Sequence, residues 1–331
     1  MTSSHQICPT DGDAPGCHEA PLRKRPARIV GACAGAIALA SGIEPSAAPP
    51  RPVDPVELNH VVMAVDQATY DAVVASPFLR DVFANGGVQT VVVDPDESWT
   101  GRYVMGERLY LEVFGPGGRE GREPGFVALA FSTRSAGDID RIESRLRQLV
   151  GNRAHRLLRT RQVGSETRPW FHAVSVDPPS FDRRAGAWVM EYPGGHLRGL
   201  GLEEDRMPAR EDYLAALRRA RGQSDPPPSR LLEDVTGIDL RLAEGEAADL
   251  AALLLASGWT RATTGDRQFA LRGAGLVLRV TLDPAPDPRL RAIEFSLRRS
   301  PDAERRVELS DHSRLTVRTD GTARWVFDAG H

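Results

Sequence analysis

Cysteine and lysine are almost missing from this sequence. Cys8, Cys17 and Cys33 all lie at the N-terminal end, and Lys24 is the only lysine. From about residue 53 onward the chain has neither type. That part therefore cannot build a disulfide framework, a thiolate nucleophile, an iron–sulfur cluster or a Schiff-base lysine. Any chemistry there must come from His, Glu, Asp, Tyr, Ser, Arg or a metal held by nitrogen and oxygen atoms.

A surplus of charge of one sign is also missing. The net charge is −3 over 331 residues, of which 41% are apolar and 26% are charged. This balance suits one large or two small globular domains. Because basic residues form no stripe and are not interleaved with aromatic residues, we expect no nucleic-acid partner.

The N-terminal segment has the layout of a secretory signal peptide. Residues 22–42 contain a basic run, an apolar stretch and then small residues, with cleavage expected after Ala40 or Ala48. The apolar stretch is short for a stable membrane span, which needs roughly 20 residues. We expect residues 1–48 to be a signal peptide or a disordered leader. The protein would then be secreted or extracytoplasmic, and cytoplasmic if the leader is not a signal.

One pattern of elements occurs repeatedly after a Pro-rich join. A strand over 58–66 ends at Asp66, which is suited to cap the following helix. A strand over 88–94 and a hairpin over 99–114 complete a βαβββ unit. A second copy begins with a strand over 125–132 and a helix capped by Asp138.

The C-terminal part repeats the pattern more weakly. A helix and a Pro-rich linker over 201–230 precede a strand at 237–243, a helix at 247–258 and further strands up to 297. The expected division is therefore a two-module domain over 53–200, the linker, and a third module over 231–331. A repeated unit of this size must pair with a neighbour to bury its sheet.

One carboxylate lies between aromatic residues on a strand. Tyr110, Glu112 and Phe114 alternate with apolar residues and so share one strand face. Burying a carboxylate without a partner is expensive. Glu112 therefore either faces solvent or is held in a pocket for a purpose.

Four segments give the chain a family resemblance: LNHVVMAVD (58–66), YLEVFGP (110–116), GFVALAFSTRSAGDID (125–140) and WVMEYP (188–193). With these segments the sequence resembles the vicinal oxygen chelate superfamily, which includes glyoxalases and bleomycin-resistance proteins, and within it an uncharacterised glyoxalase-like subfamily. The resemblance implies an α+β fold in which paired βαβββ modules form a cupped mixed sheet. A third, degenerate βαβββ-like module would follow.

The resemblance also implies a divalent-metal site inside the cup. It places His60 on the first strand, Glu112 on the fourth and Glu191 on the eighth as metal ligands. The fifth strand has Ala128 near the position of the expected second histidine, and His172 on a neighbouring strand could replace it. Two His and two Glu suit Zn, Fe, Mn or Ni. Glu112 or Glu191 would then move a proton during catalysis.

Side chains near these positions are candidates for substrate binding. They are mostly aromatic: Trp99, Arg102, Tyr103, Tyr110, Phe114 and Trp170. Arg102 and Tyr103 are adjacent on a strand, so only one of them can face the cup. An arginine there would suit an anionic substrate.

Three functions remain open from the sequence. The first is a metal-dependent lyase, isomerase or dioxygenase that acts on a small oxygenated substrate. The second is a metal-free protein that binds or sequesters a small molecule, as bleomycin-resistance relatives do, and the missing fifth-strand histidine favours it. The third is a scaffold whose cup is filled by its own side chains.

The third module offers Asp239 and Glu294 at positions that match His60 and Glu112. Without a histidine it reads as structural. Because a single module leaves an open sheet, it must pack on the first pair or on a second chain, and a homodimer is one expectation.

Overall fold

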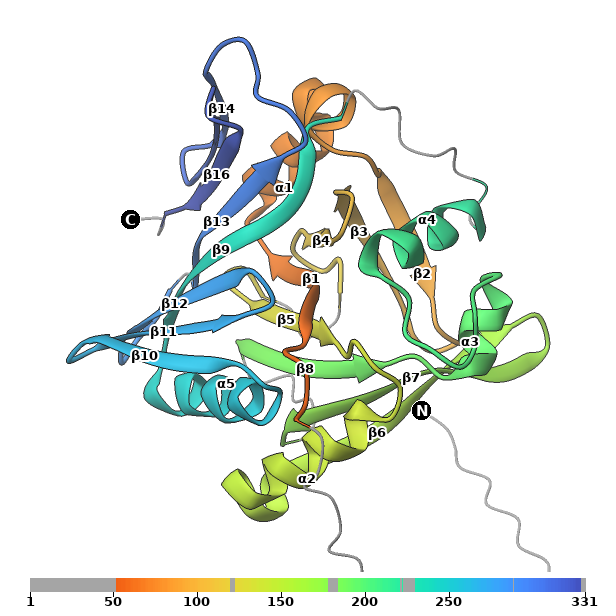
Figure 1. Ribbon diagram of the computed structural model, residues 1–331. Helices are drawn as coiled ribbons and strands as arrows, with labels where there is room; N and C mark the ends of the chain where they lie inside the picture. Colours follow the sequence, from red (N-terminus) through yellow and green to blue (C-terminus); the bar gives the residue numbers. More distant parts are fainter. Residues whose placement is uncertain are drawn as a thin grey trace, which may run out of the picture. The chain divides into compact units, whose positions relative to one another are not determined.

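Two eight-stranded sheets make up the folded part of the chain (Figure 1). The computed structural model describes residues 52–119, 123–177, 184–220, 222, 230–287 and 289–328. The expected leader over 1–48, with its cysteines, lies outside the described residues. Residues from Arg51 onward belong to one compact unit. No helix among the described residues is long and apolar enough to cross a membrane.

Sheet A contains the two modules expected over 53–200. Its strands are β1 (Glu57–Ala64), β2 (Val88–Val92), β3 (Ser98–Met105), β4 (Tyr110–Phe114), β5 (Val127–Ser132), β6 (Ala154–Val163), β7 (Glu166–Val176) and β8 (Ala185–Glu191). Their spatial order is β2-β3-β4-β1-β5-β8-β7-β6. β1 pairs in parallel with β4, β5 pairs in parallel with β8, and the two modules meet where β1 and β5 run antiparallel.

Sheet B repeats this order over the C-terminal part. Its strands are β9 (Leu232–Leu242), β10 (Thr260–Gly265), β11 (Gln268–Gly273), β12 (Leu276–Leu282), β13 (Leu290–Leu297), β14 (Arg305–Ser310), β15 (Ser313–Val317) and β16 (Thr322–Phe327). Their order is β10-β11-β12-β9-β13-β16-β15-β14. The α+β fold of paired βαβββ modules is therefore confirmed, and a further group of four strands follows the expected third module.

Helices cross over between strands in three of the four strand groups. They are α1 (Gln67–Ala75) with the short π-helix η1 (Leu79–Phe83), α2 (Asp138–Val150) with the 3-10 turn η2 (Gly151–Arg153), and α5 (Glu244–Ala256). Two more helices, α3 (Gly194–Gly199) and α4 (Arg210–Ala220), follow β8. Asp66 caps α1 as predicted, since its carboxylate accepts from the Thr69 amide at 2.8 Å.

The fourth strand group has no helix among the described residues. β13 is joined directly to β14 through residues 298–304. A helical crossover carries the chain back to the end of the sheet from which it came, so that the next strand runs in the same direction. Because this crossover is missing after β13, β16 runs antiparallel to β13, whereas β8 runs parallel to β5. α1 packs against β14, and the hydroxyls of Thr69 and Ser310 lie 2.7 Å apart. A helix of the first module therefore covers a strand of the fourth group.

One apolar core joins the two sheets. On β1, Val61 and Met63 point into it together with Ile238 and Leu240 of β9. α5 contacts β7 and β8 of sheet A as well as β9, β10 and β12 of sheet B, and it packs on α2. The open side of module three, for which we expected either the first pair of modules or a second chain, thus packs on sheet A within the same chain. Dimerisation stays a prediction.

Candidate functional site

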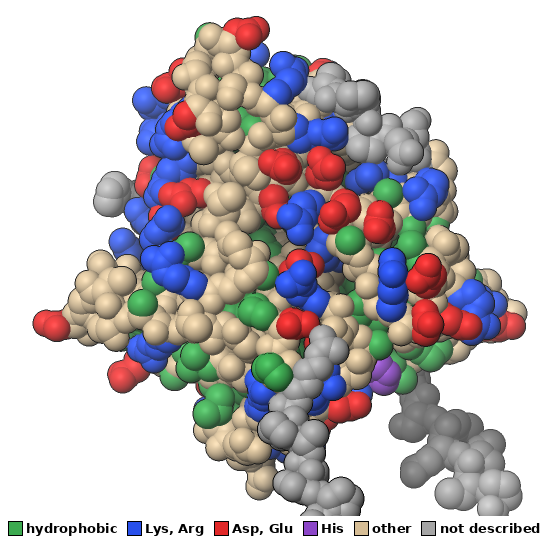
Figure 2. Space-filling model, viewed as in Figure 1, with side chains coloured by type: hydrophobic (Ala, Val, Ile, Leu, Met, Phe, Trp, Pro, Cys, Tyr) green, Lys and Arg blue, Asp and Glu red, His purple; other side chains and the backbone are tan. Residues whose placement is uncertain are grey.

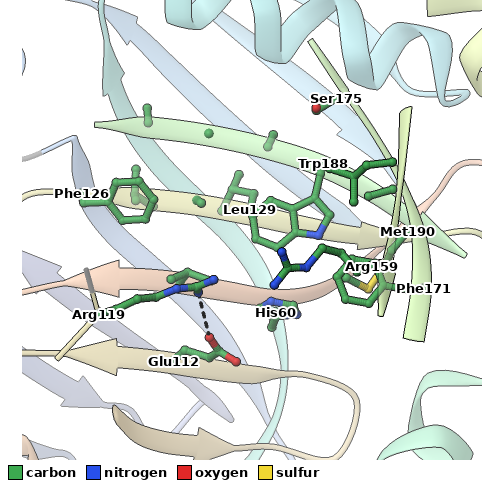
Figure 3. Close-up of a pocket in the computed structure, with 18 of the residues that line it drawn as sticks. His60, Glu112, Arg119, Phe126, Leu129, Arg159, Phe171, Ser175, Trp188 and Met190 are labelled. Atoms are coloured by element: carbon green, nitrogen blue, oxygen red, sulfur yellow. Dashed lines mark ion pairs between the residues drawn. The ribbon is translucent and has the colours of Figure 1, made fainter. Parts of the chain in front are cut away.

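A cavity of about 410 Å³ lies on the inner face of sheet A, the face turned away from the shared core (Figure 3). Side chains of β1, β3, β4, β7 and β8 line it. α4 covers part of this face, because Tyr213, Leu214 and Leu217 pack with Tyr103 and Met190. The volume lies in the range of roughly 300–1,000 Å³ that is typical of small-molecule sites.

His60 lies on the cavity wall, directly after a bulge in β1. Its Nδ1 is 2.9 Å from Asn59 Oδ1, and the Asn59 amide nitrogen donates to the Tyr192 hydroxyl at 2.9 Å. Asn59 Oδ1 must therefore accept, so Nδ1 carries the proton and Nε2 is the acceptor. No described residue is bonded to Nε2. The ring stacks on Tyr110 with centroids 4.6 Å apart and meets the edge of Trp188 at 5.6 Å.

The surroundings of His60 keep its ring neutral. Burial lowers its pKa well below 6.5, and the charges of Arg210 and Arg119 lower the pKa further. Arg210 is itself buried on α4 and donates to the Asn59 carbonyl at 3.1 Å. Near pH 7 the cavity therefore presents an imidazole lone pair rather than a positive charge.

Glu112 is held inside the cavity, and only 6% of its surface is exposed. Its Oε2 lies 3.8 Å from Arg119 Nη1, which is an ion pair rather than a close hydrogen bond (Figure 3). The Arg119 guanidinium lies over Trp99, 4.1 Å from the ring centroid. Arg119 could not be found from the sequence because it lies in a Gly-rich turn, where no periodicity marks the direction of a side chain.

The strand positions beside His60 and Glu112 carry no metal ligands. In the sheet register the row through His60 continues to Tyr110 on β4, Ala130 on β5 and Trp188 on β8. The row through Glu112 continues to Val62, Ala128 and Gly186.

A divalent ion needs three or more protein donors in sites of this kind. Within the part of the chain that the structure describes, no group of three or more His, Cys, Asp or Glu side chains could hold a metal. The residues present do not fit the metal that the resemblance implied, and no chemical step is derived through one.

Glu191 does not point into the cavity, which corrects our expectation. Its carboxylate accepts from the Gly137 amide at 2.8 Å, the Ile139 amide at 3.0 Å and the Thr133 hydroxyl at 3.1 Å. These groups lie at the start of α2, on the face of β8 that points to the shared core. We expected Asp138 to cap this helix, but the cap is a carboxylate from a distant strand. Backbone amides at a helix N-terminus favour such a negative charge.

His172 also lies outside the cavity. It is paired directly with Glu191 across β7 and β8, so it shares that residue's face. On its other side it pairs with Leu158, which is exposed. A bulge opposite Arg159 and Thr160 breaks the alternation of β7, so that Trp170 and Phe171 both line the cavity.

Four of the six expected substrate-binding residues line the cavity: Trp99, Tyr103, Tyr110 and Trp170. Phe114 is fully buried behind this wall against Gly101. Arg102 is on the opposite face of β3, where burial, followed by the charge of Arg80, lowers its pKa. The structure thus selects Tyr103 rather than Arg102 for the cavity.

Other cavity residues were missed in the sequence. Trp188 forms a wall, and its Nε1 is buried without a hydrogen-bond partner among the described residues. Arg159 reaches from β6 toward His60 (Figure 3) and forms an ion pair with Glu97 at 2.6 Å. Alternation on β8 could have shown Trp188, which lies three residues before Glu191 and therefore on the other face.

Sheet B carries an ionic network at the matching place. Arg279 lies 2.8 Å from Asp239 and 2.9 Å from Glu294, and Arg324 bonds to both acids. A Cβ on Gly237 would lie 2.4 Å from Glu294 Oε2, so a side chain there would displace the Glu294 carboxylate from the network. Arginines and acids are intermingled over β9, β13 and β16 in the space-filling view (Figure 2). Asp239 and Glu294 are therefore paired with arginines.

The described strands form paired βαβββ modules, and a cavity lies against one face of sheet A. A family model covers residues 58–327, so the chain belongs to a family described as a family of unknown function, DUF5829. None of the curated proteins matches the sequence.

The solved structures that match this chain include the following three. A hypothetical protein from Staphylococcus aureus has 6% identity and a TM-score of 0.44, over 76% of this chain and 95% of that chain. An extradiol ring-cleaving dioxygenase from B. fuscum has 14% identity and a TM-score of 0.36, over 74% of this chain and 57% of the other. A putative dioxygenase from Bacillus subtilis has 13% identity and a TM-score of 0.28, over 80% and 82%. At these TM-scores the likeness supports no statement about function.

Proposed function

We propose that this glyoxalase-like protein binds a small molecule in the inner cavity of sheet A without a metal ion. The observation that carries the proposal is the row of side chains beside His60. Where metal ligands would have to converge, the sheet presents Tyr110, Ala130 and Trp188. Aromatic rings and one polar imidazole suit a bound organic molecule better than a cation.

The unpaired polar atoms indicate the chemistry of the ligand. Trp188 Nε1 is a buried donor without a partner among the described residues. His60 Nδ1 is the atom that contacts Asn59, which leaves Nε2 to act as an acceptor toward a ligand. The two rings are 5.6 Å apart between centroids. A group that both accepts and donates, such as a phenolic hydroxyl or an amide, would satisfy both atoms.

The charged cavity residues favour a neutral ligand. The guanidinium of Arg119 is paired with Glu112, and that of Arg159 is paired with Glu97. The stacked rings of His60 and Tyr110 offer a flat surface. The ligand class we propose is therefore a flat, uncharged ring that carries a hydroxyl or amide.

The metal-dependent lyase, isomerase or dioxygenase drawn from the family resemblance is the competing function. Of the four metal ligands expected for that function, only His60 and Glu112 line the cavity. Export through the leader over 1–48 remains a prediction for either function.

Binding of 4-ethylphenol tests the proposal. Trp99, Trp170 and Trp188 line the cavity, so quenching of tryptophan fluorescence reports its occupation. His60→Phe keeps a ring but removes the acceptor, and we expect affinity to fall about tenfold. His172→Phe is the matched control, because His172 lies outside the cavity, and it should leave affinity unchanged.

Metal analysis completes the test. After exposure to Zn, Fe, Mn or Ni and dialysis, the purified protein should hold well below one equivalent of each ion. Stoichiometric metal that His60→Phe abolishes and His172→Phe retains would overturn the proposal and favour the enzyme.

A further inference from the structure

The cavity does not end at the inner face of sheet A. Its lining continues beyond β8 to side chains that point the other way, toward sheet B. We call this part the rear chamber and define it by Leu129, Ala187, Leu240, Leu250 and Leu253. Leu129 and Leu240 belong to the shared apolar core. A single cavity thus has a polar aromatic front and an apolar rear.

A separation between β7 and β8 connects the two parts. The two strands pair only where residues 172–174 meet 189–191. The rest of β8, Ala185–Trp188, is bonded to β5 but has no paired residue on β7. Three consecutive small residues, Ala185, Gly186 and Ala187, begin β8 at this place. The missing strand pairing and the small side chains coincide with the place where the cavity lining includes residues from both faces of β8.

Helix α5 forms the far wall of the rear chamber. It packs against both β7 and β8, and Leu250 and Leu253 are buried on it. Beyond them the lining ends in the acids Asp177, Glu246 and Asp249. Arg153 bonds to Asp177 and Asp249 at 2.9 and 2.6 Å, and Arg289 bonds to Glu246 at 2.8 Å. The leucines of the rear chamber are therefore accompanied by acids that are already ion-paired.

We propose that the ligand is amphiphilic: a flat polar head occupies the front of the cavity, and an unbranched apolar tail passes between β7 and β8 into the rear chamber. This inference rests on the proposed function, since it assigns a second part to the same ligand. It also gives sheet B a role in binding, because α5 and β9 supply the far wall. A polar ligand alone would leave the leucine-lined space without a matching group.

A series of 4-alkylphenols from ethyl to octyl tests the tail. Burying each added methylene in an apolar chamber should strengthen binding about three- to fourfold until the chamber is full. In the wild-type chain we expect affinity to rise with tail length and then to level off. Fluorescence titration and calorimetry on the full chain would both follow this series, below the aggregation limit of each phenol.

Ala187→Phe fills the chamber without touching the head site. It should bind 4-ethylphenol within twofold of wild type and lose most of the gain with longer tails. Ala187→Leu is a milder variant that should shorten the tail at which affinity levels off, and it serves if the Phe variant does not fold. Leu149→Phe on the exposed side of α2 is the matched control and should keep the wild-type series.

The outcomes separate the two proposals. If no 4-alkylphenol binds the wild-type chain, the proposed function fails together with this inference. If 4-ethylphenol binds in a His60-dependent way but longer tails bring no gain, the inference fails alone. The same failure follows if the gain per methylene is equal in Ala187→Leu and wild type at every length.

Discussion

Removing the Glu191 carboxylate should destabilise the protein and leave ligand binding intact. The structure gives this side chain three hydrogen bonds at the start of α2, and its exposed fraction is 9%. Glu191→Ala leaves the Gly137 and Ile139 amides without their acceptor in a partly water-excluded place. It also removes a negative charge from the N-terminal end of the α2 dipole.

The magnitude follows from these contacts. Loss of a helix cap costs about 1 kcal/mol, and hydrogen bonds to a charged group contribute about 1.5–3 kcal/mol each, part of which water recovers. We therefore expect the free energy of unfolding to fall by about 2–4 kcal/mol for Glu191→Ala. Glu191→Gln keeps an acceptor oxygen and should lose about 1 kcal/mol. For a chain of this size the Ala variant should melt about 5–10 °C lower.

Urea denaturation followed by circular dichroism measures the loss, and fluorescence titration with 4-ethylphenol measures binding. Glu143, an acid on α2 whose side chain is 14% exposed and bonds to Arg147 and Arg156, provides the matched control Glu143→Ala, which should cost less than Glu191→Ala because it leaves no helix-terminal amide without an acceptor. The reasoning is refuted if Glu191→Ala is as stable as wild type but no longer binds ligand or metal.

Three further predictions concern groups outside α2. Burial lowers the pKa of His60 well below 6.5 and that of His196 to about 4, so the unfolded chain takes up more protons below pH 6.5. Stability should therefore fall as the pH drops from about 6.5 toward 4. The fall should be less steep in the His60→Phe, His196→Phe double variant. The urea midpoint, measured at several pH values in this range, would show both effects. Arg102 is buried without a hydrogen-bond partner for Nε among the described residues, so Arg102→Met should leave the melting temperature unchanged or raise it; a drop of several degrees would contradict this. Gly237→Ala should lower the melting temperature, because its Cβ would lie 2.4 Å from Glu294 Oε2, and the loss should shrink in a Gly237→Ala, Glu294→Ala double variant.

The family resemblance predicted the paired βαβββ modules and the inward position of His60, and alternation along β4 supported the inward position of Glu112. Alternation was not sufficient for Glu191. That residue shares a face with Val189, an apolar neighbour that belongs to the shared core rather than to the cavity. Both faces of sheet A are buried, one by the cavity and α4 and the other by the shared core. A buried neighbour therefore cannot tell which face a residue takes.

Bulges account for the misplacement of His172. The extra residue in β7 places Trp170 and Phe171 on the same side, so a count by twos from Trp170 assigns His172 to the wrong face. The bulge at Asn59, by contrast, serves the cavity, because it places the Asn59 side-chain amide where it orients the His60 ring. Pro169 flanks the bulge in β7 and was a signal for it, whereas no glycine or proline marks the bulge at Asn59.

The group of strands β13 to β16 could not be predicted from the sequence either. A βαβββ pattern is recognised by its helix, and the chain between β13 and β14 has none. The strand over 290–297 was therefore read as the end of module three, whereas it opens a new group beside β9.

The shared use of α1 has a consequence for the covalent continuity of the chain. Sheet B packs against α1, because the hydroxyl of Thr69 contacts that of Ser310, more than two hundred residues later in the chain. In addition, the Leu231 amide donates to the carbonyls of Val82 and Phe83. A protease cut between α4 and β9 would thus sever the backbone without releasing either half. The two fragments should travel together through a gel-filtration column and melt in one transition, as a single particle made of two pieces.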